Sequence, residues 1–279
     1  MAKVLDGKTL AQNMRQAICQ EVENMAVKPG LAVIVVGESP ASRIYVDSKK
    51  KDCAACGVYS EEVVLSEDAG QEALLKEIEK LNKRADIHGI LIQFPLPKGY
   101  NPREVVQAID PEKDVDGFHQ LNAGKLFTGD FGLLPCTPAG VMAILDHYEI
   151  PIQGKHAVVV GCSNVVGKPQ ALMLLHRDAT VTVCHTFTED LAFHTRQADI
   201  LVAAAGKRDL IRKDMVKPGA VVIDIGINEK PGGGICGDVS YDEVAPIASY
   251  ITPVPGGVGP VTRAVLMENT LKAAKAQMG

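Results

Sequence analysis

The chain has 279 residues, about the length of two domains, and 46% of them are hydrophobic, which is enough for a sizeable core and argues against disorder. A net charge of −5, no Trp and 4% aromatic residues argue against a nucleic-acid-binding surface. No apolar run reaches the roughly 18 residues that span a bilayer, and the seven scattered cysteines suit reduced thiols, so we expect a cytoplasmic protein.

The first half of the chain alternates buried strands with helices. An amphipathic helix is expected near the N-terminus, beginning about Asp6 or Thr9. The apolar run LAVIVVG predicts a buried strand over 31–37. In chain order, the next predicted elements are a helix at 41–57, a strand at 58–65, a helix at 71–82, a strand at 88–97 stopped by prolines, and a helix at 102–109. This alternation indicates βαβ units and a parallel sheet.

The second half repeats the pattern after a boundary within 110–140. The strand candidates are 156–161, 180–184, 199–206 and 220–228, with helices beginning near Pro169 and Leu191 and a last helix over about 261–276. Four buried strands with short crossovers predict one doubly wound domain. The segment 252–260, TPVPGGVGP, is dense in Pro and Gly and predicts a loop.

A glycine-rich turn over 161–169 joins the first of these strands to a helix. Such a turn presents backbone N–H groups and a helix N-terminus to an anion, although its spacing is not GxGxxG and an ordinary βα turn is the alternative. The next strand ends in CHTFT, with no acidic residue before Glu189. Because NAD-binding folds commonly place an acid there, the absence favours NADP.

Polar residues also stand out in the first half. Tyr45 and Lys49 share one face of a predicted helix, where a buried lysine could exchange protons near neutrality, but spacing alone favours a solvated lysine. Gln93 follows an apolar strand, at the end where α/β proteins bind ligands, and a capping role is equally consistent. Asp114 and Asp116 precede Gly117 and suit either a ligand contact or a turn.

These segments together resemble one family, the bifunctional methylenetetrahydrofolate dehydrogenase/methenyltetrahydrofolate cyclohydrolases. The matching motifs, in order along nearly the whole chain, are SRIYVDSKKK (42–51), GILIQFPLP (89–97), PEKDVDGFH (111–119), LPCTPAG (134–140), VVVGCSNVVGKP (158–169), TVTVCHTFT (180–188), IDIGIN (223–228) and TPVPGGVGP (252–260). No single motif carries the resemblance.

The resemblance implies an α/β fold with two domains. Residues 1–118, completed by the C-terminal helix 261–279, would form an N-terminal folate-binding catalytic domain, and residues 119–260 a Rossmann-like NAD(P)-binding domain with a parallel sheet. It also implies a folate site between the domains, NADP as cofactor, no metal, a homodimer, and a place in the one-carbon metabolism that feeds purine biosynthesis.

The resemblance assigns roles to individual residues. The catalytic residues would be Lys49, Tyr45 and Gln93. Asp116 would hold the pterin N–H groups, and Pro255, Gly256 and Gly257 would line the substrate site. The residues implied for the cofactor are Gly161, Cys162, Ser163, Thr186 and Ile227.

The implied chemistry is hydride transfer from 5,10-methylenetetrahydrofolate to the nicotinamide, followed by hydrolysis of the methenyl product to 10-formyltetrahydrofolate, with Lys49 in the proton transfers. The chain departs from the family at Cys162, where NADP-using members usually have an arginine that can pair with the 2′-phosphate. Hydrogen bonds from Ser163 and Thr186, or the charge of Lys168 or Arg177, could compensate for the missing arginine, and NAD use or weak NADP binding is the alternative. A dehydrogenase without cyclohydrolase activity and a non-catalytic folate- or dinucleotide-binding module are further alternatives, which the retained Lys49 argues against.

Overall fold

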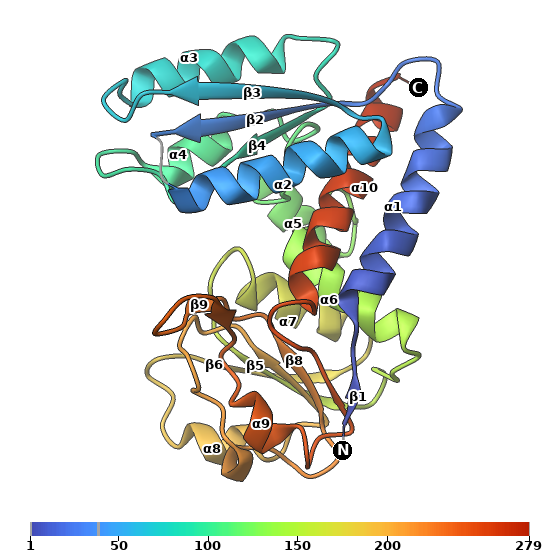
Figure 1. Cartoon of the computed structure of the whole chain (residues 1–279), viewed down its shortest axis with the longest axis vertical. Coiled ribbons are helices and arrows are strands. Elements are labelled where there is room, and N and C mark those ends of the chain that lie inside the picture. Colours follow the sequence, from blue (N-terminus) through green and yellow to red (C-terminus); the bar gives the residue numbers. More distant parts are fainter. Residues whose placement is uncertain (1, 38–39, 279) are drawn as a thin grey trace. The chain divides into compact units, whose positions relative to one another are not determined.

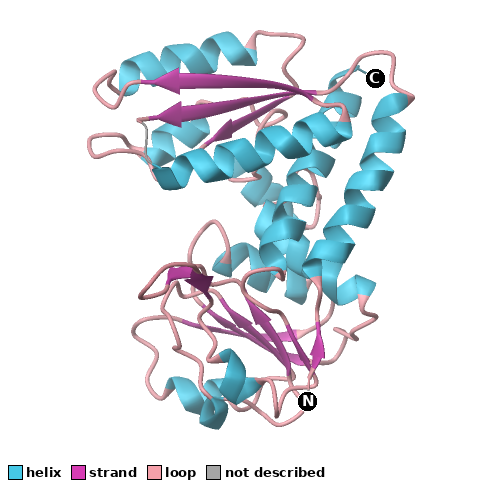
Figure 2. Ribbon diagram, in the orientation of Figure 1, coloured by secondary structure: helices cyan, strands magenta, loops and turns pink. Residues whose placement is uncertain are grey.

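The computed structural model describes residues 2–37 and 40–278, and the side chains of residues 40–42, 44 and 45 also lie outside the described part. The chain folds into two compact units, and each unit is built from two segments that are separate in the sequence. One unit comprises Met1–Ala11 and Thr137–Thr262, and the other comprises Gln12–Cys136 and Arg263–Gly279. We call the first the nucleotide unit and the second the lysine unit. The α/β class with parallel sheets is confirmed (Figures 1 and 2).

The lysine unit contains a three-stranded parallel sheet in the order β3-β2-β4. Its strands are β2 (Gly30–Val36), β3 (Tyr59–Leu65) and β4 (Gly89–Ile92), and its helices are α2 (Pro40–Cys56), α3 (Gln71–Asn82), α4 (Pro102–Gln107), α5 (Gln120–Thr128) and most of α1 (Gly7–Glu23) and α10 (Val258–Met278). The face of β2 that carries Ala32, Ile34 and Val36 packs against α3 and α4. Leu74, Ile78 and Leu81 of α3 are fully buried there, as their helical spacing predicts.

The nucleotide unit is built on a six-stranded parallel sheet in the order β1-β11-β8-β7-β5-β6. Its strands are β1 (Lys3–Val4), β5 (His156–Val160), β6 (Thr180–Cys184), β7 (Ile200–Ala203), β8 (Val221–Asp224) and β11 (Tyr250–Ile251), and its other elements are α6 (Cys136–His147), α7 (Gly167–Leu175), α8 (Leu191–Thr195), the 3₁₀ helix η1 (Lys213–Met215), α9 (Tyr241–Val244) and the hairpin β9 (Asn228–Glu229) and β10 (Ile235–Cys236). Of the four strands predicted to be buried, β5, β7 and β8 are buried in the middle of the sheet, whereas β6 lies at its edge and is partly exposed, which corrects the prediction for that strand. The strand order is doubly wound, as expected.

The N-terminus supplies an edge strand that the sequence does not predict. Lys3 and Val4 pair in parallel with Tyr250 and Ile251, so the first residues of the chain belong to the nucleotide unit. Residues 119–136, by contrast, belong to the lysine unit, so these compact units have other limits than the predicted functional domains, 1–118 with 261–279 and 119–260. Within the described residues, no helix combines the length and apolar composition needed to cross a membrane.

Candidate active site

Lys49 and Gln93 meet in the lysine unit. Lys49 lies on α2, and its Nζ donates a hydrogen bond to Gln93 Oε1 at 2.9 Å. Gln93 directly follows β4, where its backbone N–H donates to the Ile34 carbonyl and its side-chain Nε2 donates to the Phe94 carbonyl, both at 2.8 Å. Because the amide nitrogen is occupied in this way, the amide oxygen faces the lysine. The predicted pair is therefore brought together, whereas the side chain of Tyr45, also on α2, lies outside the described part and its role stays a prediction.

Asp116 adds a negative charge to this pair. Burial raises its pKa to about 6, while the charge of Lys49 and a hydrogen bond from the Cys136 thiol lower it. Burial likewise lowers the pKa of Lys49, against the opposing charge of Asp116. A lysine with a lowered pKa beside a carboxyl with a raised pKa is typical of sites that transfer protons.

The loop that carries Asp116 is held by buried polar groups. The Asp114 carboxylate accepts hydrogen bonds from the His119 backbone N–H and from Asn122 Nδ2, both at 2.8 Å. Asn269 Nδ2, from α10, donates to the carbonyls of Val115 and Leu134, also at 2.8 Å. Asp114 therefore has a structural role in the DVDG motif, whereas the ligand role of Asp116 stays a prediction.

Gly117 completes this loop with a backbone conformation of positive φ (71°). A Cβ at this position would lie 2.6 Å from the backbone of Leu134 and Pro135, so the loop can approach the 134–135 segment only with glycine. The polar residues that sequence reasoning missed here are Cys136 and Asn269. The sequence offers one signal for Asn269, which is a polar residue within the mostly apolar stretch AVLMENTL. In the structure this side chain is buried.

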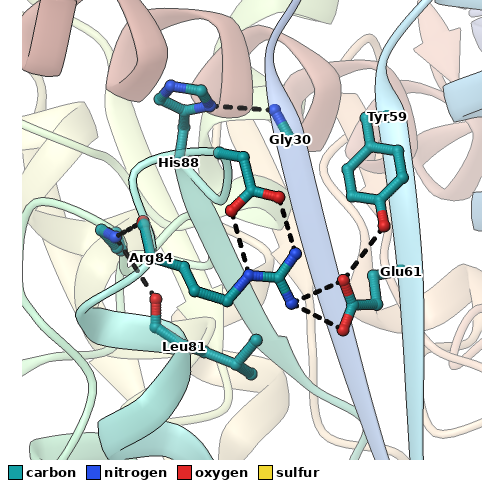
Figure 3. Close-up of polar contacts among 8 residues, drawn as sticks. Gly30, Tyr59, Glu61, Leu81, Arg84 and His88 are labelled. Atoms are coloured by element: carbon teal, nitrogen blue, oxygen red, sulfur yellow. Dashed lines mark hydrogen bonds and ion pairs between the residues drawn. The ribbon is translucent and has the colours of Figure 1, made fainter.

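The opposite, amino-terminal edge of the same sheet is a structural network. The Arg84 guanidinium pairs with Glu61 and Asp86, and Tyr59 OH donates to Glu61 (Figure 3). The His88 Nδ1 accepts the Gly30 N–H at 3.0 Å. Since these groups satisfy one another and lie at the edge away from Gln93, they fix strand ends and are not candidates for catalysis.

In the nucleotide unit, the turn from β5 to α7 has the form of an anion cradle. Gly161 has φ 126°, and a Cβ there would lie 2.2 Å from the Ala204 carbonyl oxygen. Ser163 Oγ accepts the N–H groups of Val166 and Gly167. The backbone N–H groups of residues 162–165 donate to no acceptor in the described part of the chain. Unpaired N–H groups at a helix N-terminus fit a dinucleotide phosphate.

The other residues predicted for the cofactor are exposed at the same carboxyl edge. Cys162 and Thr186 are exposed, and Ile227 is 53% exposed after β8. Lys168 lies in the first turn of α7, where its Nζ bonds to Asn164 Oδ1. Compensation by Arg177 is not supported, because Arg177 follows the other end of α7 and pairs there with Asp146.

The predicted VPGG turn is tightly packed against the N-terminal segment of the same unit. Gly7 donates its N–H to the Gly256 carbonyl at 3.0 Å, and Gly257 donates to the Pro253 carbonyl at 2.8 Å. A Cβ on Gly7 would lie 1.8 Å from the Gly257 carbonyl oxygen. The Val254–Pro255 peptide bond is cis, as is Phe94–Pro95.

A cavity of about 230 Å³ lies at the amino edge of the six-stranded sheet, away from all these residues. Its Lys217 and Asp199 are already paired with each other at 2.6 Å. Because parallel sheets bind ligands at the carboxyl ends of their strands, the cradle at Gly161 is the stronger candidate.

Comparison with known proteins identifies the family. Residues 5–116 match the tetrahydrofolate dehydrogenase/cyclohydrolase catalytic domain, and residues 135–278 match the corresponding NAD(P)-binding domain. The bifunctional protein FolD of Acetivibrio thermocellus is 53% identical over 279 residues, covering 99% of this chain and 98% of that protein.

Solved structures agree with this match. The bifunctional enzyme FolD, methylenetetrahydrofolate dehydrogenase/cyclohydrolase, of Campylobacter jejuni superposes with a TM-score of 0.97 at 48% identity, covering 99% of each chain. The methylenetetrahydrofolate dehydrogenase-cyclohydrolase of Trypanosoma brucei, solved with NADP and an inhibitor, gives a TM-score of 0.95 at 38% identity, covering 99% of this chain and 98% of that one. The chain therefore belongs to the tetrahydrofolate dehydrogenase/cyclohydrolase family.

Proposed function

We propose that this protein oxidises 5,10-methylenetetrahydrofolate to the 5,10-methenyl compound with NADP, and then hydrolyses that product to 10-formyltetrahydrofolate. Relatives named as bifunctional dehydrogenase/cyclohydrolases match the chain over its whole length at about half identity. The observation that carries the proposal is the 2.9 Å bond between Lys49 Nζ and Gln93 Oε1, beside Asp116, because it puts a proton-transfer pair within the catalytic domain.

Lys49 would serve the hydrolytic step. Water adds to the methenyl carbon and loses a proton, the C–N bond of the ring then breaks, and the leaving nitrogen takes up a proton. A lysine whose pKa is lowered by burial gives up its proton more readily than a solvated lysine, which suits it to these transfers. Gln93 would hold the ammonium or amine in place, since its own amide is fixed by the Phe94 carbonyl.

Asp116 would bind the substrate. A carboxylate accepts two parallel N–H bonds, which matches the amino group and adjacent ring N–H of a pterin. The Asn269 and Asp114 hydrogen bonds hold its loop before any ligand arrives, so little ordering is needed on binding.

For the oxidative step, the bound NADP supplies the hydride acceptor. The cradle over 161–167 would hold its phosphates through the N–H groups of residues 162–165, and Ser163 shapes the turn. The Pro255–Gly257 turn would border the substrate. The protein's contribution to this step is alignment, since the folate nitrogen lone pair expels the hydride.

Cofactor preference rests on the residue after Gly161. The exposed Cys162 cannot pair with a 2′-phosphate as an arginine does. We therefore propose that the enzyme uses NADP but binds its 2′-phosphate weakly, through Lys168 and the Thr186 hydroxyl. An NAD-preferring enzyme is the second candidate, and Cys162 is the observation that favours it.

Steady-state dehydrogenase kinetics with NADP and NAD in parallel test the function and the preference together. Reduction of either cofactor that depends on methylenetetrahydrofolate, followed by release of the 10-formyl product, supports the proposal. Methenyl product without ring opening would indicate a dehydrogenase alone, and binding without turnover would indicate a binding module.

The variant Cys162→Arg sharpens the cofactor test. The added guanidinium is expected to raise the ratio of kcat/KM for NADP over NAD by on the order of tenfold, as one charged hydrogen-bonded pair would. An unchanged ratio would mean that the 2′-phosphate lies elsewhere.

We also propose a homodimer in the cytoplasm, with a product that supplies purine biosynthesis. The family resemblance supports the dimer, and β6 stands at the end of the six-stranded sheet with Val183 39% exposed. Sedimentation equilibrium at micromolar protein would measure the oligomeric state, and a monomer throughout would contradict it.

A further inference from the structure

Two buried carboxylates lie close together in the nucleotide unit, outside the residues considered so far. Asp224 ends β8 and is 4% exposed, and Asp238 follows β10 and is 0% exposed. Burying two acids is costly unless each is hydrogen-bonded, so their partners reveal what they hold.

Asp238 holds the loop that follows β7. Its Oδ2 accepts the backbone N–H groups of Ala205 and Gly206, at 2.7 and 2.9 Å. Its Oδ1 accepts Asn228 Nδ2 at 2.9 Å. Two successive N–H groups on one charged oxygen fix the path of a loop that has no other regular structure.

Asp224 holds Asp238 in turn. Its Oδ1 accepts the N–H groups of Gly226 and Asp238, and its Oδ2 accepts the Val239 N–H, at 2.9 to 3.0 Å. The two acids pack directly against glycine backbone. A Cβ on Gly226 would lie 2.2 Å from Asp238 Oδ1, and a Cβ on Gly237 would lie 1.8 Å from Asp224 Oδ2.

The loop held by Asp238 lies at the switch point of the sheet. β5 pairs with β7, but the chain continues from β5 to the strand on one side and from β7 to the strand on the other. Open parallel sheets bind their ligand in the crevice at this point. The loop also contacts the cradle, because a Cβ on Gly161 would lie 2.2 Å from the Ala204 oxygen.

We propose that Asp238 is a positioning residue for the dinucleotide, which holds the Ala204–Gly206 loop against the Gly161 turn as the wall of the cofactor crevice, with Asp224 as its support. This inference rests on the proposed function, since it takes the ligand of the crevice to be NADP. Neither acid needs to touch the reacting atoms.

The test compares Asp238→Asn with a matched control, Asp199→Asn. Asp199 also accepts a backbone N–H, from His156 at 3.0 Å, but it precedes β7 at the amino edge of the sheet. The dissociation constant of NADP is measured by calorimetry, and exchange of the Ala205 and Gly206 amides by hydrogen–deuterium exchange. We expect Asp238→Asn to raise the dissociation constant roughly tenfold and to speed exchange in the loop, and Asp199→Asn to change neither.

Kinetics separate positioning from general destabilisation. In Asp238→Asn, the KM for NADP is expected to rise while the KM for methylenetetrahydrofolate stays unchanged. Asn228→Ala removes the donor to Asp238 Oδ1, which also donates to the Gly237 carbonyl, and leaves both N–H bonds to Asp238 Oδ2 in place. A smaller rise in the dissociation constant is therefore expected, even if the first variant does not fold.

The outcomes are distinguishable from failure of the proposed function. Faster loop exchange with an unchanged dissociation constant would overturn the inference, as would equal effects of Asp238→Asn and Asp199→Asn. A wild-type protein that binds NADP but does not oxidise methylenetetrahydrofolate would overturn the proposed reaction, and the positioning role would still be decided by the dissociation constants. A wild type that does not bind NADP would overturn both.

Discussion

Lys49 and Asp116 lower each other's cost of burial. The charge of Asp116 raises the pKa of the lysine against desolvation, and the charge of Lys49 lowers the pKa of the carboxyl against the same effect. Removing either charge therefore changes the protonation of the other.

The variant Lys49→Met tests the proton-transfer role. Met keeps the length and apolar stem of the side chain but has no Nζ, so the cyclohydrolase rate is expected to fall by about 10²- to 10⁴-fold while folate binding is largely kept. Ring opening of methenyltetrahydrofolate, followed by its absorbance, measures the effect. Lys50→Met is the control, because Lys50 lies next to Lys49 in the sequence but pairs with Glu62 instead of Gln93. Equal losses in both variants would contradict the assigned role.

The raised pKa of Asp116 predicts that substrate binding depends on pH. Its pKa is raised to about 6 by burial, so above that pH it is a carboxylate that accepts the pterin N–H groups, and below it the carboxyl is protonated. The KM for methylenetetrahydrofolate is therefore expected to rise as the pH falls through 6, by about tenfold per pH unit. Asp116→Asn should bind weakly at every pH without this slope. A wild-type KM that stays level between about pH 5 and 8 would mean that Asp116 does not bind the pterin as its anion.

Helix α10 stabilises the loop that carries Asp116. Asn269 is 1% exposed, and its Nδ2 serves two carbonyls, those of Val115 and Leu134. Asn269→Ala leaves buried acceptors without this donor, so the free energy of unfolding is expected to fall by about 2 to 4 kcal/mol. Because loss of the Asn269 bonds also lets the Asp116 loop move, the KM for the folate substrate should rise as well.

Urea unfolding measures this loss, with Glu268→Ala as the control. Glu268 is the preceding residue, but its side chain is 38% exposed and pairs along the helix with Lys272, so its removal should cost no more than about 0.5 kcal/mol. If both variants unfold at the same urea concentration, the Asn269 bonds do not stabilise the loop.

Helices and strands whose apolar residues recur at a regular spacing could be predicted from the sequence. The strand at 30–36 and the helix at 71–82 agree with their apolar patterns within a residue. β4 ends at Ile92, earlier than predicted, and two of the next five residues, Pro95 and Pro97, could not donate to a sheet. β1 and β11, with two residues each, are too short for a period, and α5 falls in a segment whose charged and turn residues predict a boundary.

The site could be predicted only through the family resemblance. Helical spacing favoured a solvated Lys49, because the partner that defines its role, Gln93, is 44 residues away in the sequence. The Asn269 bond to Val115 spans 154 residues. Local pattern carries no information on such pairs, and the same holds for the contact of Asp238 with Ala205.

Each of the two compact units combines segments that are far apart in the sequence. The nucleotide unit needs residues 1–11 for its edge strand, and the lysine unit needs residues 263–279 for Asn269. Each unit is therefore completed by one end of the chain, the nucleotide unit by the N-terminal segment and the lysine unit by the C-terminal segment.

Ligand-dependent protection tests whether these units are also the functional domains. A ligand at one hundred times its dissociation constant stabilises the part that binds it by about 2.7 kcal/mol, which slows hydrogen exchange through openings of that part. We expect NADP to slow exchange most within residues 137–262, and a folate substrate analogue to slow it most within residues 12–136. Residues 263–279 should follow the folate analogue despite their distance in sequence, because α10 holds the Asp116 loop through Asn269. Stronger protection of 263–279 by NADP than by the analogue would assign the last helix to the nucleotide-binding domain and contradict the proposed division.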